Sequence, residues 1–155
     1  MSRYEAMVVR KCAAAPQQVY RVLADVPGWP TWIRPVSGAA FERVGDADPQ
    51  GAGAIRRISV LGIPLAREEI LEARPPCYQQ YAITSGLPVK SYVGTIQIDH
   101  EGDEGSIITW GFTLEPRIAG TGPLLRMAMA RAAAFLASSL VAAAERSEAP
   151  DREIG

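Results

Sequence analysis

The sequence predicts an α+β domain in which a seven-stranded antiparallel sheet wraps around one long C-terminal helix, with one or two short helices after the first strand. Two observations predict the sheet: seven short segments carry alternating apolar or β-branched residues, and turn formers separate the last six at close spacing. A third predicts the helix, because residues 122–146 change to apolar spacings of three and four. A sheet of this size needs its apolar face covered, and only this helix is long enough to cover it.

A strand and a short helix open the chain. Alternation predicts the strand over residues 3–12. Pro16 suits the first turn of a helix, because its missing N–H would have no partner there. Apolar residues then recur at helical spacing up to Val26, and Pro27-Gly28 is expected to end the helix.

The segment DVPGWPTWIRPV, residues 25–36, holds two of the three tryptophans among three prolines. This proline density excludes a helix and a central strand, so we expect an irregular loop. Trp29 and Trp32 are therefore expected on a segment without regular backbone structure.

Six further strands are expected in the middle of the chain. They lie near residues 38–44, 53–61, 65–73, 77–84, 91–99 and 106–115. Turns such as LGIP, SGLP and EGDEG join them into an antiparallel meander. In the last and most regular strand, Ile108, Trp110, Phe112 and Leu114 share one face, which we expect to point inward.

The long helix is expected to start near Gly122-Pro123 and to end at about Arg146. Its expected inner stripe is Leu125, Met129, Ala132, Leu136, Ser139 and Ala143. Many helix residues are alanines, whose small side chains do not fill the space under a curled sheet, and this favours an internal cavity. Residues 1–147 are interpreted as one domain, followed by a polar tail over residues 148–155.

Charge and motifs exclude several function classes. The net charge is −1 with no basic stripe, so nucleic acid is not an expected partner. Arg126 and Arg131 interrupt the most apolar region, which argues against a membrane span, and we expect a cytoplasmic monomer or homodimer. No metal-ligand spacing, phosphate loop or nucleophile elbow is present, so no metal or cofactor is expected. The single histidine, His100, lies beside a turn and is expected at the surface.

The element order and several motifs resemble the START-like superfamily, also called SRPBCC or Bet v1-like. The motifs are APQQVYRVLADVPGWPTWIRPV, GAGAIRRISVLGIPLAREEILE, YAITSGLPV and ITWGFTLEP, followed by the terminal helix. The resemblance covers residues 3–146 and is closest to polyketide cyclase/dehydrase or lipid-transport-like members. It implies a helix-grip fold with a hydrophobic tunnel between sheet and helix, and it places the tryptophan loop at a mouth of that tunnel. Trp32 then becomes a candidate for ligand contact, with packing under the short helix as the alternative for both tryptophans.

Because side chains alternate along a strand, two different sets of residues around residue 56 could point inward. Either Ile55, Arg57 and Ser59 point inward, or Ala54, Arg56, Ile58 and Val60 do. Similarity of the GIP turn to hormone-receptor relatives favours the first set and also turns Glu68 inward. Arg57 and Glu68 would then pair inside the cavity and orient a carboxylate or ketone of a ligand. The alternative is that both are solvated on the outer face.

Aromatic residues and one methionine complete the candidate site. Parity and the resemblance turn Tyr81 and Tyr92 inward, where their hydroxyls could hydrogen-bond a ligand or Tyr81 could act as a general acid. The catalytic candidates are Arg57, Glu68 and Tyr81. The candidate ligand-binding residues are Trp32, Ile55, Arg57, Glu68, Tyr81, Tyr92, Trp110, Phe112 and Met129.

Three functions are compatible with these features. The first is binding or carrying a small hydrophobic molecule of lipid, polyketide or isoprenoid type in an internal cavity. The second is a cyclase or dehydratase acting on a polyketide-like substrate, which needs little more than a shaped pocket and one or two polar groups. The third is a non-catalytic interaction module whose interior is closed by packing.

Overall fold

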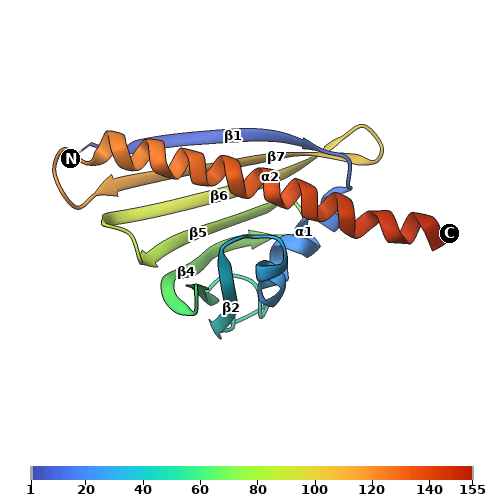
Figure 1. Cartoon of the computed structure of the whole chain (residues 1–155), viewed down its shortest axis with the longest axis horizontal. Coiled ribbons are helices and arrows are strands. Elements are labelled where there is room, and N and C mark those ends of the chain that lie inside the picture. Colours follow the sequence, from blue (N-terminus) through green and yellow to red (C-terminus); the bar gives the residue numbers. More distant parts are fainter. Residues whose placement is uncertain (1, 155) are drawn as a thin grey trace.

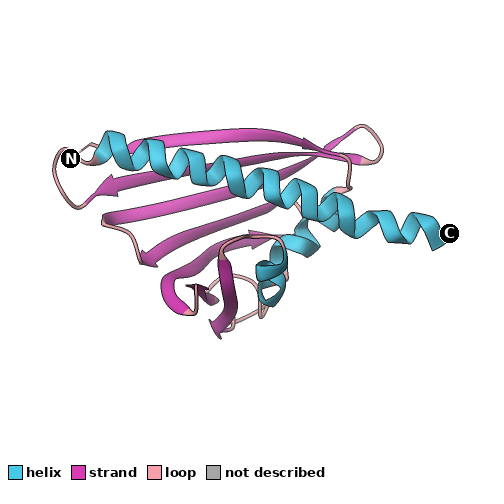
Figure 2. Cartoon of the chain, in the orientation of Figure 1, coloured by secondary structure: helices cyan, strands magenta, loops and turns pink. Residues whose placement is uncertain are grey.

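The computed structural model describes the backbone of residues 2–154 and the side chains of residues 2–147. One sheet and two α-helices make up most of it (Figures 1 and 2). The strands are β1 (Tyr4–Cys12), β2 (Val36–Arg43), β3 (Ile55–Val60), β4 (Ile63–Arg74), β5 (Tyr78–Ser85), β6 (Val89–Glu101) and β7 (Gly105–Pro116). The helices are α1 (Pro16–Ala24), the short 3₁₀ helix η1 (Val26–Thr31) and α2 (Gly122–Ile154).

The seven strands form one antiparallel sheet in the order β1-β7-β6-β5-β4-β3-β2. Helix α2 runs along one face of this sheet (Figure 1). At one end, η1 packs against β2, and α1 packs against α2 and β6. The predicted helix-grip fold is confirmed. The face with Ile108, Trp110, Phe112 and Leu114 is buried, as the alternation in β7 predicts.

Helix α2 is held along the edge strand β1 by hydrogen bonds from both elements. The Arg126 Nε donates to the Glu5 carbonyl at 2.9 Å, and the Arg10 Nε donates to the Ser138 hydroxyl at 3.1 Å. At the far end of β1, the Ala13 N–H donates to the Glu145 carboxylate at 2.8 Å. The helix therefore covers an edge that would otherwise present unpaired backbone groups.

The most deeply buried positions of α2 are Ala133, Ala137, Leu140 and Ala144. This stripe is shifted by about one residue from the predicted one. Small alanines occur on several faces of the helix, so its rotation about its own axis is set by the elements that pack against it. The stretch Gly122–Ser147 has the length and composition of a membrane span, and here one side of it lies against β1 and β7 while much of it is exposed.

Two expectations about the backbone were wrong. The tryptophan segment contains a 3₁₀ helix, because its turn hydrogen bonds are donated by Gly28, Trp32 and Ile33 and so avoid the prolines that lack an N–H. Helix α2 continues to Ile154, past the end that we expected near Arg146 and into the predicted polar tail. The side chains of residues 148–155 lie outside the described part of the chain.

Candidate functional site

A cavity of about 160 Å³ lies between the curled part of the sheet, α1, η1 and α2. Its apolar wall includes Leu23 from α1 and Leu136 from α2. All three tryptophans of the chain, Trp29, Trp32 and Trp110, also line it. The cavity wall is thus mostly apolar, and the three tryptophans and Tyr81 are its aromatic residues.

An arginine and its partners supply the polar part of the wall. Arg56 is only 2% exposed, and its Nη2 donates to the Glu68 carboxylate at 2.6 Å. Its Nη1 donates to the side-chain oxygen of Gln79 at 3.0 Å. A buried arginine needs such partners, because an unpaired charge in the interior costs several kcal/mol. The two partners hold the guanidinium in one orientation.

The guanidinium of Arg56 also lies over two aromatic rings. Its central carbon is 4.9 Å from the ring centroid of Trp29 and 5.3 Å from that of Tyr81. Trp29 is itself fixed, because its indole N–H donates to the Leu23 carbonyl at 3.0 Å. Among the described residues, the Nε of Arg56 has no hydrogen-bond partner. The site therefore holds a fixed cation with hydrogen-bond donors to spare.

The prediction that Arg57 points inward was wrong. Arg57 is exposed on the outer face opposite Arg67, and Ile55 shares that outer face. The register of β3 and β4 explains the error. A regular hairpin closed at Val60 and Ile63 would place Glu68 opposite Ile55, on the same face as Arg57.

One extra residue in β4 changes this register. Ile58 pairs with Ala66 while Ser59 pairs with Pro64, so Leu65 is left over as a bulge. Beyond the bulge Glu68 lies directly opposite Arg56, and the two side chains share the inner face. The inward placement of Glu68 was therefore right, but its partner is Arg56.

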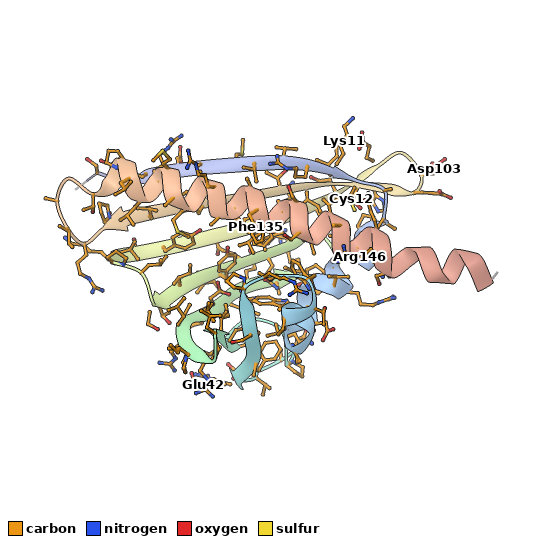
Figure 3. The ribbon with its side chains drawn as sticks, viewed as in Figure 1. Lys11, Cys12, Glu42, Asp103, Phe135 and Arg146 are labelled. Carbon is orange, nitrogen blue, oxygen red and sulfur yellow. The ribbon has the colours of Figure 1, made fainter. Side chains whose placement is uncertain are left out.

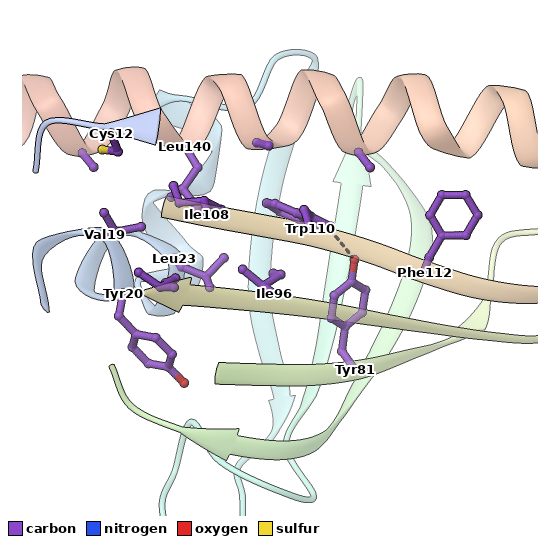
Figure 4. Packing of buried hydrophobic residues seen from close by; sticks show 14 of the residues in the cluster. Cys12, Val19, Tyr20, Leu23, Tyr81, Ile96, Ile108, Trp110, Phe112 and Leu140 are labelled. Atoms are coloured by element: carbon purple, nitrogen blue, oxygen red, sulfur yellow. Dashed lines mark hydrogen bonds between the residues drawn. The ribbon is translucent and has the colours of Figure 1, made fainter. Parts of the chain in front are cut away.

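Tyr81 forms the wall between the cavity and the rest of the core. It is buried, and its hydroxyl accepts a hydrogen bond of 3.0 Å from the Trp110 indole N–H (Figure 4). Burial raises the pKa of the Tyr81 hydroxyl well above its ordinary value, and the nearby Glu68 raises it further. The hydroxyl is therefore neutral over the whole physiological range.

Besides Ile55 and Arg57, three predicted ligand-binding residues lie outside the cavity lining: Tyr92, Phe112 and Met129. Tyr92 stacks on Phe112, with ring centroids 5.4 Å apart and an angle of 12° between the planes, and this stack fills the neighbouring part of the core. Met129 is half-buried and packs against the same cluster. Trp32, Glu68, Tyr81 and Trp110 are the predicted residues that do line the cavity.

Sequence reasoning missed two important wall residues. Gln79 is two positions before Tyr81 on β5, so the alternation that turns Tyr81 inward also turns Gln79 inward. Trp29 was interpreted mainly as core packing, and the sequence holds no signal that would bring its ring over an arginine 27 positions later.

Metal chemistry has no candidate residues in the described part of the chain. No group of three or more His, Cys, Asp and Glu side chains among these residues could hold a metal ion. His100 is exposed near the end of β6.

The family of the chain follows from its sequence. Residues 5–145 match the family described as "Polyketide cyclase / dehydrase and lipid transport", and the chain belongs to this family. Its fold is that of the START-like superfamily. Among curated proteins, none matches the chain.

Solved structures with low sequence identity share the fold. A START superfamily protein from Mycobacterium smegmatis superposes with a TM-score of 0.78 at 13% identity, covering 92% of this chain and 98% of that one. The Zhui aromatase/cyclase from Streptomyces sp. R1128 gives 0.78 at 18% identity, covering 94% and 95%. The protein TTHA0849 from Thermus thermophilus gives 0.70 at 24% identity, covering 92% and 98%.

Proposed function

We propose that this protein binds a small, mainly apolar molecule that carries one neutral hydrogen-bond acceptor. The observation that carries the proposal is the buried Arg56, which lines a cavity together with three tryptophans and whose Nε has no hydrogen-bond partner among the described residues. The apolar part of the ligand would lie against the indole rings, and its acceptor would meet the guanidinium.

The size of the cavity limits the apolar part of the ligand. A cavity of about 150 Å³ holds a molecule of the size of benzene, and the cavity here has about 160 Å³. Within the lipid, polyketide and isoprenoid classes, this size supports a single ring or a single prenyl unit as the buried portion. A longer chain would have to extend past Trp32 and Leu136 or widen the cavity.

The Glu68 carboxylate determines whether a charged or a neutral hydrogen-bond acceptor is favoured on the ligand. Because Glu68 already neutralises Arg56 at 2.6 Å, a ligand carboxylate would bring a second negative charge next to the first. A ketone or hydroxyl oxygen accepts the hydrogen bond without that repulsion. We therefore expect a neutral carbonyl rather than an acid.

A cyclase or dehydratase is the second candidate, supported by the presence of Arg56, Glu68 and Tyr81 on one cavity wall. Such a reaction needs a group that exchanges a proton near neutral pH. The raised pKa of Tyr81 makes its hydroxyl a weaker acid, and Glu68 is held by Arg56. Binding without turnover is thus the function that the site supports best.

The binding proposal is tested with two probes of matched shape, acetophenone and cumene, which differ in the carbonyl oxygen. The tryptophan indole N–H signals in NMR spectra report occupancy, since all three indoles line the cavity. We expect both probes to shift these signals and acetophenone to bind about tenfold more tightly, as a hydrogen bond of roughly 1.4 kcal/mol to a charged group would give.

A double variant, Arg56→Met with Glu68→Met, removes both charges together, which buried pairs often tolerate. It should keep the melting temperature close to that of the unmodified protein and bind both probes equally. The matched control Arg57→Met should keep the tenfold preference. Absence of any indole shift with either probe would overturn the proposal.

A further inference from the structure

Exposed apolar side chains gather at one end of the sheet. Of the eleven large hydrophobic residues that are exposed in the described part of the chain, five belong to this end. They are Leu61, Ile63, Leu65, Ile118 and Leu124. Three are in or next to the β3–β4 turn, and two are in the β7–α2 connection or the first turn of α2. We call this region the apolar end.

Contacts between turns show that the segments of the apolar end adjoin one another. The Gly62 N–H donates to the Ser37 hydroxyl at 2.8 Å, which joins the β3–β4 turn to the start of β2. Gly86 in the β5–β6 turn lies so close to β4 that a Cβ there would be 2.3 Å from the Leu65 carbonyl oxygen. The Arg117 N–H donates to the Pro88 carbonyl at 3.1 Å and joins the β7–α2 connection to the same turn.

The β3–β4 turn exposes its leucine at a position that does not favour leucine. Leu61 and Gly62 have φ values of 53° and 79°, which is a two-residue type I′ turn. Such turns favour Asn-Gly, because asparagine tolerates a positive φ while leucine is strained there. Leu61 is nevertheless 81% exposed, so its side chain gains nothing from the protein's own core. Backbone strain and apolar exposure together indicate that this side chain serves a contact outside the chain.

The charged residues in the connecting segments of this end are basic. In the segments 32–37, 60–66, 85–90 and 116–125, the charged residues are Arg34, Lys90 and Arg117. At the opposite end, the β2–β3 connection and the β6–β7 turn carry acidic residues, and Asp103 projects from the β6–β7 turn, although Lys11 and Arg146 also lie at that end (Figure 3). The protein therefore has a charge asymmetry along its strands, and the basic charge coincides with the exposed apolar side chains.

We propose that the apolar end docks on an anionic lipid bilayer. Leu61, Ile63 and Ile118 project from turns and a connection, a shape suited to entering the interface between headgroups and acyl chains. Arg34, Lys90 and Arg117 then meet the anionic headgroups, and the acidic opposite end is turned away from the surface. This docking does not depend on which molecule occupies the cavity.

The test is co-sedimentation of the full chain with vesicles of phosphatidylcholine alone and of phosphatidylcholine with 30% phosphatidylglycerol. We expect the protein to bind the anionic vesicles. Its affinity should fall at least tenfold as the salt concentration rises from about 50 to 500 mM, because the Debye length shrinks. Leu61→Asn should weaken binding about tenfold and leave the melting temperature unchanged or higher, since asparagine suits the turn. Leu71→Asn is the matched control at an exposed leucine away from this end, and it should bind as the unmodified protein does.

Four outcomes would overturn the proposal. The first is absence of sedimentation with anionic vesicles. The second is equal binding by Leu61→Asn and the unmodified protein. The third is a dimer in solution that Leu61→Asn dissociates while vesicle binding is absent, which would identify the apolar end as a protein interface. A Lys90→Ala, Arg117→Ala double variant should lose about fivefold per removed charge, and unchanged affinity in that variant would also contradict the proposal.

Discussion

The interior differs on the two sides of Tyr81, although one sheet and one helix enclose both. On one side, Arg56, Glu68 and Gln79 surround a cavity. On the other side, Tyr92 stacks on Phe112 and fills the space under α2. The difference teaches that the curl of the sheet does not by itself leave a cavity, because rings of sufficient size fill the same layer.

The side of Tyr81 that contains Arg56, which we call the open side, keeps its cavity for a physical reason. Arg56 needs its partners in fixed places, and its guanidinium is held between Glu68, Gln79 and the rings of Trp29 and Tyr81. Apolar side chains can approach one another until no space remains, but hydrogen-bonded groups keep the distances that their bonds require. The filled side has no such constraint among the residues described there.

The largest effect is expected from removing the arginine of the open side. Arg56→Ala leaves Glu68 buried without its charge partner, and we expect a loss of about 3–5 kcal/mol in the free energy of unfolding. The neighbouring Arg57→Ala removes an exposed arginine and should change the same quantity by less than about 0.5 kcal/mol. Urea denaturation of both variants measures the difference. Equal losses would show that the inward placement of Arg56 is wrong.

A smaller effect is expected from moving the wall between the two sides. Gly94 lies opposite Tyr81 in the sheet, and a Cβ at this position would be 2.3 Å from the Cζ of the Tyr81 ring. Gly94→Ala should push the ring away, weaken its hydrogen bond with Trp110 and lower the free energy of unfolding by about 1–3 kcal/mol.

Gly38 provides the matched control for this prediction. It also lies in a strand, but nothing is within 4 Å of a Cβ there, so Gly38→Ala should be nearly neutral. The Trp110 indole N–H signal in NMR spectra should shift in Gly94→Ala and stay in place in Gly38→Ala. A Gly94→Ala protein with unchanged stability and an unshifted indole signal would contradict the role of Tyr81 as a fixed wall.

The smallest effect on stability is expected at alkaline pH, on the side of Tyr81 that Tyr92 and Phe112 fill. Burial raises the pKa of Tyr92 above its ordinary value of 10.0, and the nearby Tyr81 and Glu68 raise it further. The folded state therefore holds the phenol proton more tightly than the unfolded state, so the stabilisation is complete below pH 10 and decreases as the pH rises beyond it.

Between pH 10 and 11, the unmodified protein should lose about 1 kcal/mol more stability than Tyr92→Phe. Urea denaturation at the two pH values measures this difference. Parallel pH dependence of the two proteins would show that Tyr92 ionises in the folded state as easily as in the unfolded state.

The placement of individual side chains was predicted well where a strand is regular. The inner face of β7 follows from simple alternation, so Trp110 and Phe112 were assigned correctly to the interior. Alternation does not say what an inward side chain touches. Trp110 reaches the cavity, while Phe112 meets Tyr92, and only the packing of neighbouring strands separates the two.

The amino-acid sequence by itself determined the element order, the antiparallel meander and the covering helix, because hydrophobic periodicity and turn residues are local properties. Tertiary structure alone decided that Arg56 rather than Arg57 faces the cavity, since a bulge at Leu65 changes the register between two strands. It also decided that Trp29 closes over that arginine, because the contact joins segments that are separated in the chain. Such contacts depend on how elements pack together, and no local pattern records that.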